Sequence, residues 1–211
     1  MNEPHKNERR SAMSYWTRIL RAGALLTIVV ILSGCGAMTA QNPGEGLSPI
    51  NGIANESDDH LILFGADVVA YFTDNQHIQG SPEYRSEYRG VDFYFSSAEN
   101  KALFDADPTA YIPQYGGYCA NGIVFGIPWG GNAEDFIVHD DKLYIFGGDI
   151  SKQAFLLDLD NNLALSERYW EEEVKDNNSF WQRLKRLVIR VPHYQTGEEQ
   201  AAAVKAAQQV Q

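Results

Sequence analysis

The sequence contains few cysteines and few basic residues, and each shortage excludes a class of protein. Only Cys35 and Cys119 occur in 211 residues, and they form no Cys-x-x-Cys pair. Thioredoxin-like thiol exchange is therefore not expected. Lys and Arg number 17 against 28 Asp and Glu. Because phosphate binding depends on clustered cations, we expect no nucleic-acid partner.

The motifs of several enzyme classes are also missing from the sequence. The five histidines show neither an i, i+4 pair nor the His-Glu-x-x-His pattern of a metalloprotease. There is no Gly-x-Ser-x-Gly elbow of a serine hydrolase and no Gly-x-Gly-x-x-Gly dinucleotide fingerprint. Paired acids such as Asp58-Asp59 are interpreted as solvated surface. We assign no catalytic residue and expect a non-enzymatic protein.

No apolar run reaches the roughly 20 residues that a bilayer-spanning helix needs. The run at residues 22–32 follows Arg18 and Arg21 and closes on Leu32-Ser-Gly-Cys35. A basic region, a short apolar core and small residues before a cut site are typical of a secretory signal peptide. The ending resembles the bacterial lipobox, which implies acylation of Cys35 and cleavage before it. Residues 1–34 are therefore predicted to be the signal peptide.

The predicted lipid anchor places the protein in the bacterial cell envelope. Gly36 after the cysteine favours the outer membrane, with the protein facing the periplasm. Met13 offers a more usual start, which leaves residues 1–12 as a candidate over-called extension, and an uncleaved anchor remains the alternative. Residues 35–59 are expected to be the lipidated cysteine and a flexible tether, because they are rich in Gly, Asn, Pro and Ser. Once Cys35 is acylated, no internal disulfide can form.

Residues 60–175 carry the patterns of an α+β domain. Strands are expected at residues 84–88 and 91–95, around a turn at Arg89-Gly90. Ser96 and Glu99 form a capping box that opens a helix after this hairpin. A second hairpin joins residues 136–139 to 143–146. Further helical sequence, with a cap at Ser151 and a break around Asn161-Asn162, follows the second hairpin.

Residues 176–211 are predicted to form an amphipathic helix and a tail rich in Ala and Gln. Six apolar residues recur at helical spacing between residues 180 and 191: Phe180, Trp181, Leu184, Leu187, Val188 and Val191. Four cations occupy the other face: Arg183, Lys185, Arg186 and Arg190. We expect the helix to dock on the acidic domain through its apolar stripe. The alternative is contact with anionic lipid or an acidic protein.

The segment from Gly65 to Phe146 is similar to a YHS domain. The motifs that carry the resemblance include Gly65-Ala-Asp-Val-Val-Ala-Tyr-Phe72, Gly80-Ser-Pro-Glu-Tyr84, Phe95-Ser-Ser-Ala-Glu-Asn100, Phe104-Asp-Ala-Asp-Pro108 and Tyr115-Gly-Gly-Tyr-Cys-Ala120. The resemblance implies a compact unit in which a β-hairpin is followed by a helix. Metal-binding members of this family carry cysteines at the positions of Ala70, Ser96 and Asn100. Without these thiolates we expect no tight, thiolate-rich zinc or copper(I) site.

Cys119 is the most promising candidate for a functional side chain. It lies among glycines in Tyr115-Gly-Gly-Tyr-Cys119, which suits the wall of a pocket. We predict a binding site for a small ligand or metal ion around Cys119, with Tyr115, Tyr118 and His139 as neighbours. The cofactor is unknown, a metal ion being one candidate. Three alternatives stay open: a thiol-dependent enzyme or redox protein, an envelope interaction protein without a small ligand, and a purely structural, buried cysteine.

Overall fold

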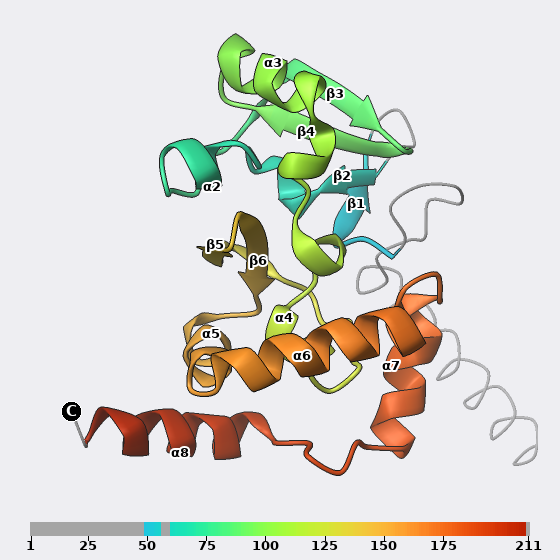
Figure 1. Cartoon of the computed structure of the whole chain (residues 1–211). Coiled ribbons are helices and arrows are strands. Elements are labelled where there is room, and N and C mark those ends of the chain that lie inside the picture. The colour runs from blue at the N-terminus through green and yellow to red at the C-terminus, as the bar shows by residue number, and fades with distance from the viewer. Residues whose placement is uncertain (1–48, 56–59, 210–211) are drawn as a thin grey trace, which may run out of the picture. The chain divides into compact units, whose positions relative to one another are not determined.

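The computed structural model describes residues 49–55 and 60–209, and the α+β prediction is confirmed (Figure 1). The predicted signal peptide and Cys35 lie outside these residues, so cleavage and lipidation stay predictions. Within the two described ranges, no helix is both long enough and apolar enough to cross a membrane.

A four-stranded mixed sheet forms one half of the described domain. Its strands lie in the order β1-β2-β4-β3. Their bounds are Gly52–Ala54 for β1, His60–Ile62 for β2, Ser81–Tyr88 for β3 and Val91–Phe95 for β4. The first predicted hairpin is confirmed, since Tyr88 pairs with Val91 around Arg89-Gly90. Both turn residues have positive φ, as a tight turn that follows the strand twist requires.

The described domain begins inside the segment that the sequence predicted to be a tether. Ile50 is fully buried, and β1 pairs antiparallel with β2. The Asn51 amide donates hydrogen bonds to the backbone oxygens of Gly117 and Gly131. The two isoleucines Ile50 and Ile53, among Pro, Asn and Gly, are too few to give a periodic signal, so the sequence placed the start of the domain too late.

The second predicted hairpin is also present and divides two hydrophobic cores. It pairs β5 (Asn132–His139) with β6 (Lys142–Phe146). Alternate residues of a strand point to opposite faces. Leu143 and Ile145 therefore join the core under the four-stranded sheet, whereas Tyr144 and Phe146 join a second core among the helices.

Seven α-helices complete the described domain. They are α2 (Ala70–Thr73), α3 (Ala98–Ala106), α4 (Ala120–Ile123), α5 (Asp149–Leu156), α6 (Leu159–Tyr169), α7 (Ser179–Val188) and α8 (Gly197–Gln208). Helix α3 packs on β3 and β4, and α8 runs beside α5 (Figure 1). Short 3-10 turns lie at Leu63–Gly65, Pro108–Ala110 and Gln114–Gly117, and the π-helical turn η4 spans Trp170–Val174.

Three predicted helix boundaries differ from the structure. The N-cap of α3 is Ser97, which accepts from the Asn100 amide, because Ser96 is bonded elsewhere. Helix α5 is capped by Gly148, which places Ser151 inside the helix. The break before α6 lies at residues 157–158, so Asn161-Asn162 is helical.

The predicted C-terminal tail is a helix rather than an irregular segment. Thr196 caps α8 and forms a reciprocal capping box with Glu199. Gln200 and Val204 are buried against the rest of the domain. The sequence contains this capping signal, but a run of alanines offers too weak an apolar stripe to reveal the packed face.

Helix α7 docks in the opposite orientation from the one that we expected. Its buried residues are Ser179, Gln182 and Arg186, whereas four members of the apolar stripe face outward: Trp181, Leu184, Leu187 and Val188. Val191, beyond the end of α7, is buried. Gln182 donates to the Gly126 carbonyl at 2.8 Å, and Arg183 donates to the Pro128 carbonyl at 2.7 Å. The loop after α4 thus presents carbonyl groups that polar side chains satisfy, and this requirement determines which face of α7 is buried.

Candidate ligand pocket

Cys119 has a clear structural role at the start of α4. Its side chain is buried, and its sulfur accepts a hydrogen bond from the Gly122 amide at 3.4 Å as the N-cap of the helix. The Ser151 hydroxyl of α5 lies 3.1 Å from the sulfur. The Cys119 amide donates to the Trp129 carbonyl at 2.9 Å. These contacts fix α4 between the second hairpin and α5.

The protonation of Cys119 does not favour nucleophilic chemistry. Burial raises the pKa of the Cys119 thiol, and the hydrogen bonds from Ser151 and Gly122 only oppose the rise. The thiolate is the form that attacks electrophiles and binds metals. A thiol whose pKa is raised is therefore poorly suited to the alternative of a thiol-dependent enzyme.

His139 does not lie next to Cys119. It pairs with Lys142 at the tip of the second hairpin, while Cys119 forms a bridge with Ile145. Lys142 and Ile145 are three residues apart on β6, so the two contacts are separated by about 10 Å. The half-exposed His139 ring instead lies 3.5 Å from the Asp140 carboxylate. The structure thus separates two members of the predicted site.

The two predicted tyrosines contact other helices. Tyr115 is buried, and its hydroxyl lies 2.8 Å from Ser166 Oγ, which itself donates to the Leu163 carbonyl. Tyr115 is therefore the donor, and burial raises its pKa. Burial likewise raises the pKa of Tyr118 to about 12, although Ser179 and the Arg183 cation of α7 oppose this shift. The Tyr115 hydroxyl thus connects the glycine-rich segment to α6, and the Arg183 guanidinium of α7 lies over the Tyr118 ring, 5.8 Å from its centroid.

Ser96 and Asn100 belong to a hydrogen-bond network around the carboxylate of Asp67. Asp67 is fully buried. Its Oδ2 accepts hydrogen bonds from the backbone amide of Ser96, the Ser96 hydroxyl and the side-chain amide of Asn100, at 2.6–2.8 Å. Its Oδ1 accepts from the amides of Val69 and Ala70. Because Ser96 and Asn100 are committed to this carboxylate, they do not fit a soft metal ion. In the described part of the chain, no three His, Cys, Asp or Glu residues are placed to hold a metal.

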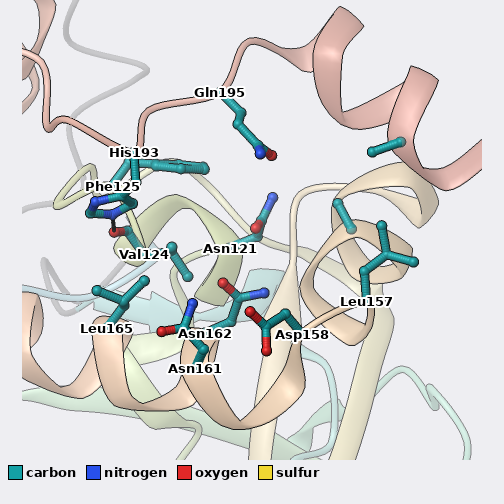
Figure 2. Close-up of a pocket in the computed structure, with 12 residues that line it drawn as sticks. Asn121, Val124, Phe125, Leu157, Asp158, Asn161, Asn162, Leu165, His193 and Gln195 are labelled. Atoms are coloured by element: carbon teal, nitrogen blue, oxygen red, sulfur yellow. Dashed lines mark hydrogen bonds between the residues drawn. The ribbon is translucent and has the colours of Figure 1, made fainter.

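A pocket of about 190 Å³ lies beside α4, and its first lining residue, Asn121, follows Cys119 by two positions in the sequence (Figure 2). Its walls come from α4, α5, α6, the segment before α8, and α8 itself. The apolar lining is Val124, Phe125, Ala154, Leu157, Leu165 and Ala203. The polar lining is Asn121, Asp158, Asn161, Asn162, His193 and Gln195. Figure 2 shows polar side chains of α4, α6 and the segment before α8 directed toward a common space.

Two carboxamides in the pocket are held in place and keep an unused acceptor. Asn121 donates to Gln200 Oε1 at 2.9 Å, and Asn162 donates to the Phe155 carbonyl at 2.9 Å. Neither side-chain oxygen accepts a hydrogen bond from the residues that the structure describes. Fixed acceptors of this kind can orient a ligand that carries hydroxyl or amide donors.

His193 contributes a ring with a defined hydrogen bond. Its Nε2 lies 2.9 Å from the Val124 carbonyl, so this nitrogen carries the proton and donates. In the neutral form of the ring, Nδ1 remains an acceptor. The ring also packs near Phe125 and Tyr169, with centroid separations of 5.9 and 5.7 Å. Asp158 is the only carboxylate in the lining, so the pocket is polar but carries little charge.

The sequence did not single out the polar residues of this pocket. They come from four segments between residues 121 and 195, and none belongs to a spaced motif. Cys119 was the nearest signal, because it caps the helix that carries Asn121. Only the packing of α6 on α4 and of α8 on α5 brings the remaining groups together.

Residues 69–115 match the YHS domain family. The match covers α2, β3, β4 and α3 and ends at Tyr115, so part of the resemblance in the sequence is confirmed. Cys119 and the pocket lie beyond it. No curated protein and no solved structure matches the chain.

Proposed function

We propose that this YHS-domain protein is a lipid-anchored, non-enzymatic binding module of the bacterial envelope. Its ligand is a small, neutral, polar organic molecule that occupies the pocket between α4, α5, α6 and α8. The observation that carries this proposal is the pair of fixed, unused carboxamide oxygens of Asn121 and Asn162 beside an apolar wall. The proposed anchor is supported by the lipobox-like sequence that ends at Cys35.

The pocket chemistry favours an organic molecule over a metal ion. Carboxamides, one imidazole and one carboxylate are spread around a volume of about 190 Å³. This volume is below the range of roughly 300–1,000 Å³ that is usual for drug-sized ligands. The apolar side of the pocket suits a carbon skeleton, and the amide oxygens suit its hydroxyl or amide groups.

Thermal unfolding with a panel of sugars, polyols and small amides tests the proposal. A compound that binds only the folded state stabilises it by about 2.7 kcal/mol at a hundredfold excess over Kd. We expect at least one compound to raise the Tm of the wild-type protein. The rise should be lost in Ala203→Trp, because Ala203 lines the mouth of the pocket.

Ala202→Trp is the matched control for this experiment. Ala202 is exposed on the same helix and does not line the pocket. It should keep the wild-type response. No stabilisation by any compound, or equal responses of the two Trp variants, would contradict a ligand in this pocket.

A further inference from the structure

Helix α7 exposes an apolar face that the described domain does not cover. The exposed fractions are 64% for Trp181, 42% for Leu184, 70% for Leu187, 77% for Val188 and 61% for Ile189. Positions 181, 184 and 188 follow the helical repeat, so these side chains share one face. Large apolar side chains gathered on one face mark a surface that contacts something other than water.

The helix cannot hide this face by rotating on the domain. Its opposite side is bound by the Gln182 and Arg183 contacts to the loop after α4. Arg186 is buried, is paired with Glu173 and lies 5.4 Å from the centroid of the Tyr169 ring. Rotation would leave a buried guanidinium and loop carbonyls without partners, which costs several kcal/mol. The outward direction of the stripe is therefore a fixed property of the fold.

The charge around this face indicates the chemistry of its partner. Residues 179–190 carry four cations and no acid, whereas the whole chain has a net charge of −11. Lys185 borders the apolar stripe and stays near solvent while it binds Glu173. Arg190 is exposed just beyond the end of α7. An anionic surface would attract this region and repel most of the remaining domain.

We propose that the outward face of α7, formed by Trp181, Leu184, Leu187 and Val188, lies on an anionic lipid bilayer. An amphipathic helix with a Trp and flanking cations inserts its apolar face at the boundary between headgroups and acyl chains. The inference rests on the proposed envelope location. The 13 residues between Cys35 and Pro49 reach at most about 45 Å, so an anchor on Cys35 would keep α7 close to the membrane.

Quenching of tryptophan fluorescence by brominated lipids tests this contact. The full chain is reconstituted in vesicles of brominated phosphatidylglycerol and phosphatidylethanolamine. The Trp181→Phe variant identifies the part of the signal that comes from Trp181. We expect strong quenching of that part, and weaker quenching in vesicles of brominated phosphatidylcholine alone.

A pair of charge substitutions shows whether the apolar face causes the contact. Leu187→Glu with Val188→Glu should abolish quenching of Trp181. Leu103→Glu with Ile150→Glu is the matched control, because both residues are exposed apolar side chains on other helices. The control should keep the wild-type quenching. In a Cys35→Ala background, the α7 double substitution should weaken vesicle flotation by about tenfold or more.

The outcomes separate this inference from the proposed anchor. Weaker flotation of Cys35→Ala than of the wild-type protein supports the anchor, and the intact mass of the wild-type protein shows whether residues 1–34 are removed. A chain that floats while Trp181 stays unquenched overturns the lipid contact and leaves the anchor in place. Failure of the full chain to float contradicts both. A wild-type dimer in detergent-free solution that becomes monomeric in the α7 double variant would assign the face to a second copy and overturn the proposal.

Discussion

A buried aspartate, Asp67, organises the hydrogen bonds at the centre of the YHS-like half. Asp67 accepts five hydrogen bonds: two from the amides of Val69 and Ala70 at the start of α2, two from Ser96 between β4 and α3, and one from the Asn100 side chain in α3. Charge-assisted hydrogen bonds to a buried group are stronger than neutral ones. The carboxylate therefore connects the start of α2, the segment before α3 and α3 itself, which carry Ala70, Ser96 and Asn100.

Asp67→Asn tests whether this carboxylate stabilises the domain. The new NH2 group would face donors instead of accepting from them. We expect a loss of about 2–4 kcal/mol in the free energy of unfolding, measured by urea denaturation. Asp141→Asn, at an exposed turn position, should change stability by less than about 0.5 kcal/mol. A near-neutral Asp67→Asn variant would show that the aspartate is dispensable.

At the scale of elements, the sequence predicted the hairpins well because each leaves a local pattern. Val91, Phe93 and Phe95 alternate on β4, and the turn at Arg89-Gly90 separates two such runs. The periodicity of α7 also predicted its helical stripe, but the stripe faces solvent and not the domain. Periodicity shows that a helix has two faces, whereas the carbonyls of Gly126 and Pro128 determine which face is buried.

The Glu173 cluster is the main electrostatic contact between η4 and α7. Burial alone would raise the pKa of Glu173, but hydrogen bonds from Lys185 and Gln182 and the charge of Arg186 hold it below its ordinary value. A lowered pKa in the folded state gives stability that is present above the unfolded pKa. That stability is lost as the pH falls through the folded value.

Glu173→Gln is expected to destabilise the protein at pH 7 by about 1–3 kcal/mol, because Arg186 stays buried without its anion. The difference from wild type should shrink as the pH falls below 4.5, where the unfolded-state carboxylate takes up its proton. Denaturation at several pH values measures this change. Glu172→Gln, at the adjacent exposed position, should show neither effect, and a pH-independent Glu173→Gln difference would contradict the charge-based account.

At the scale of the whole molecule, two cores share the β6 strand and serve different roles. The first core supports the sheet and the YHS match, and the second supports the helices that line the pocket. The pocket could not be predicted from the sequence, because its walls come from residues more than 70 positions apart. Cys119 pointed to the correct region, although its thiol holds α4 in place and does not line the pocket.

Two-dimensional NMR of the side-chain amides gives the most direct test of the proposed pocket. The protein is titrated with the compound that raises its Tm. We expect the side-chain amides of Asn121, Asn162 and Gln195 to shift together and to saturate at one Kd. The side-chain amide of Asn177, which lies just before α7 and does not line the pocket, should stay unchanged. Unshifted Asn121 and Asn162 amides, with changes elsewhere, would contradict a ligand held between α4, α6 and α8.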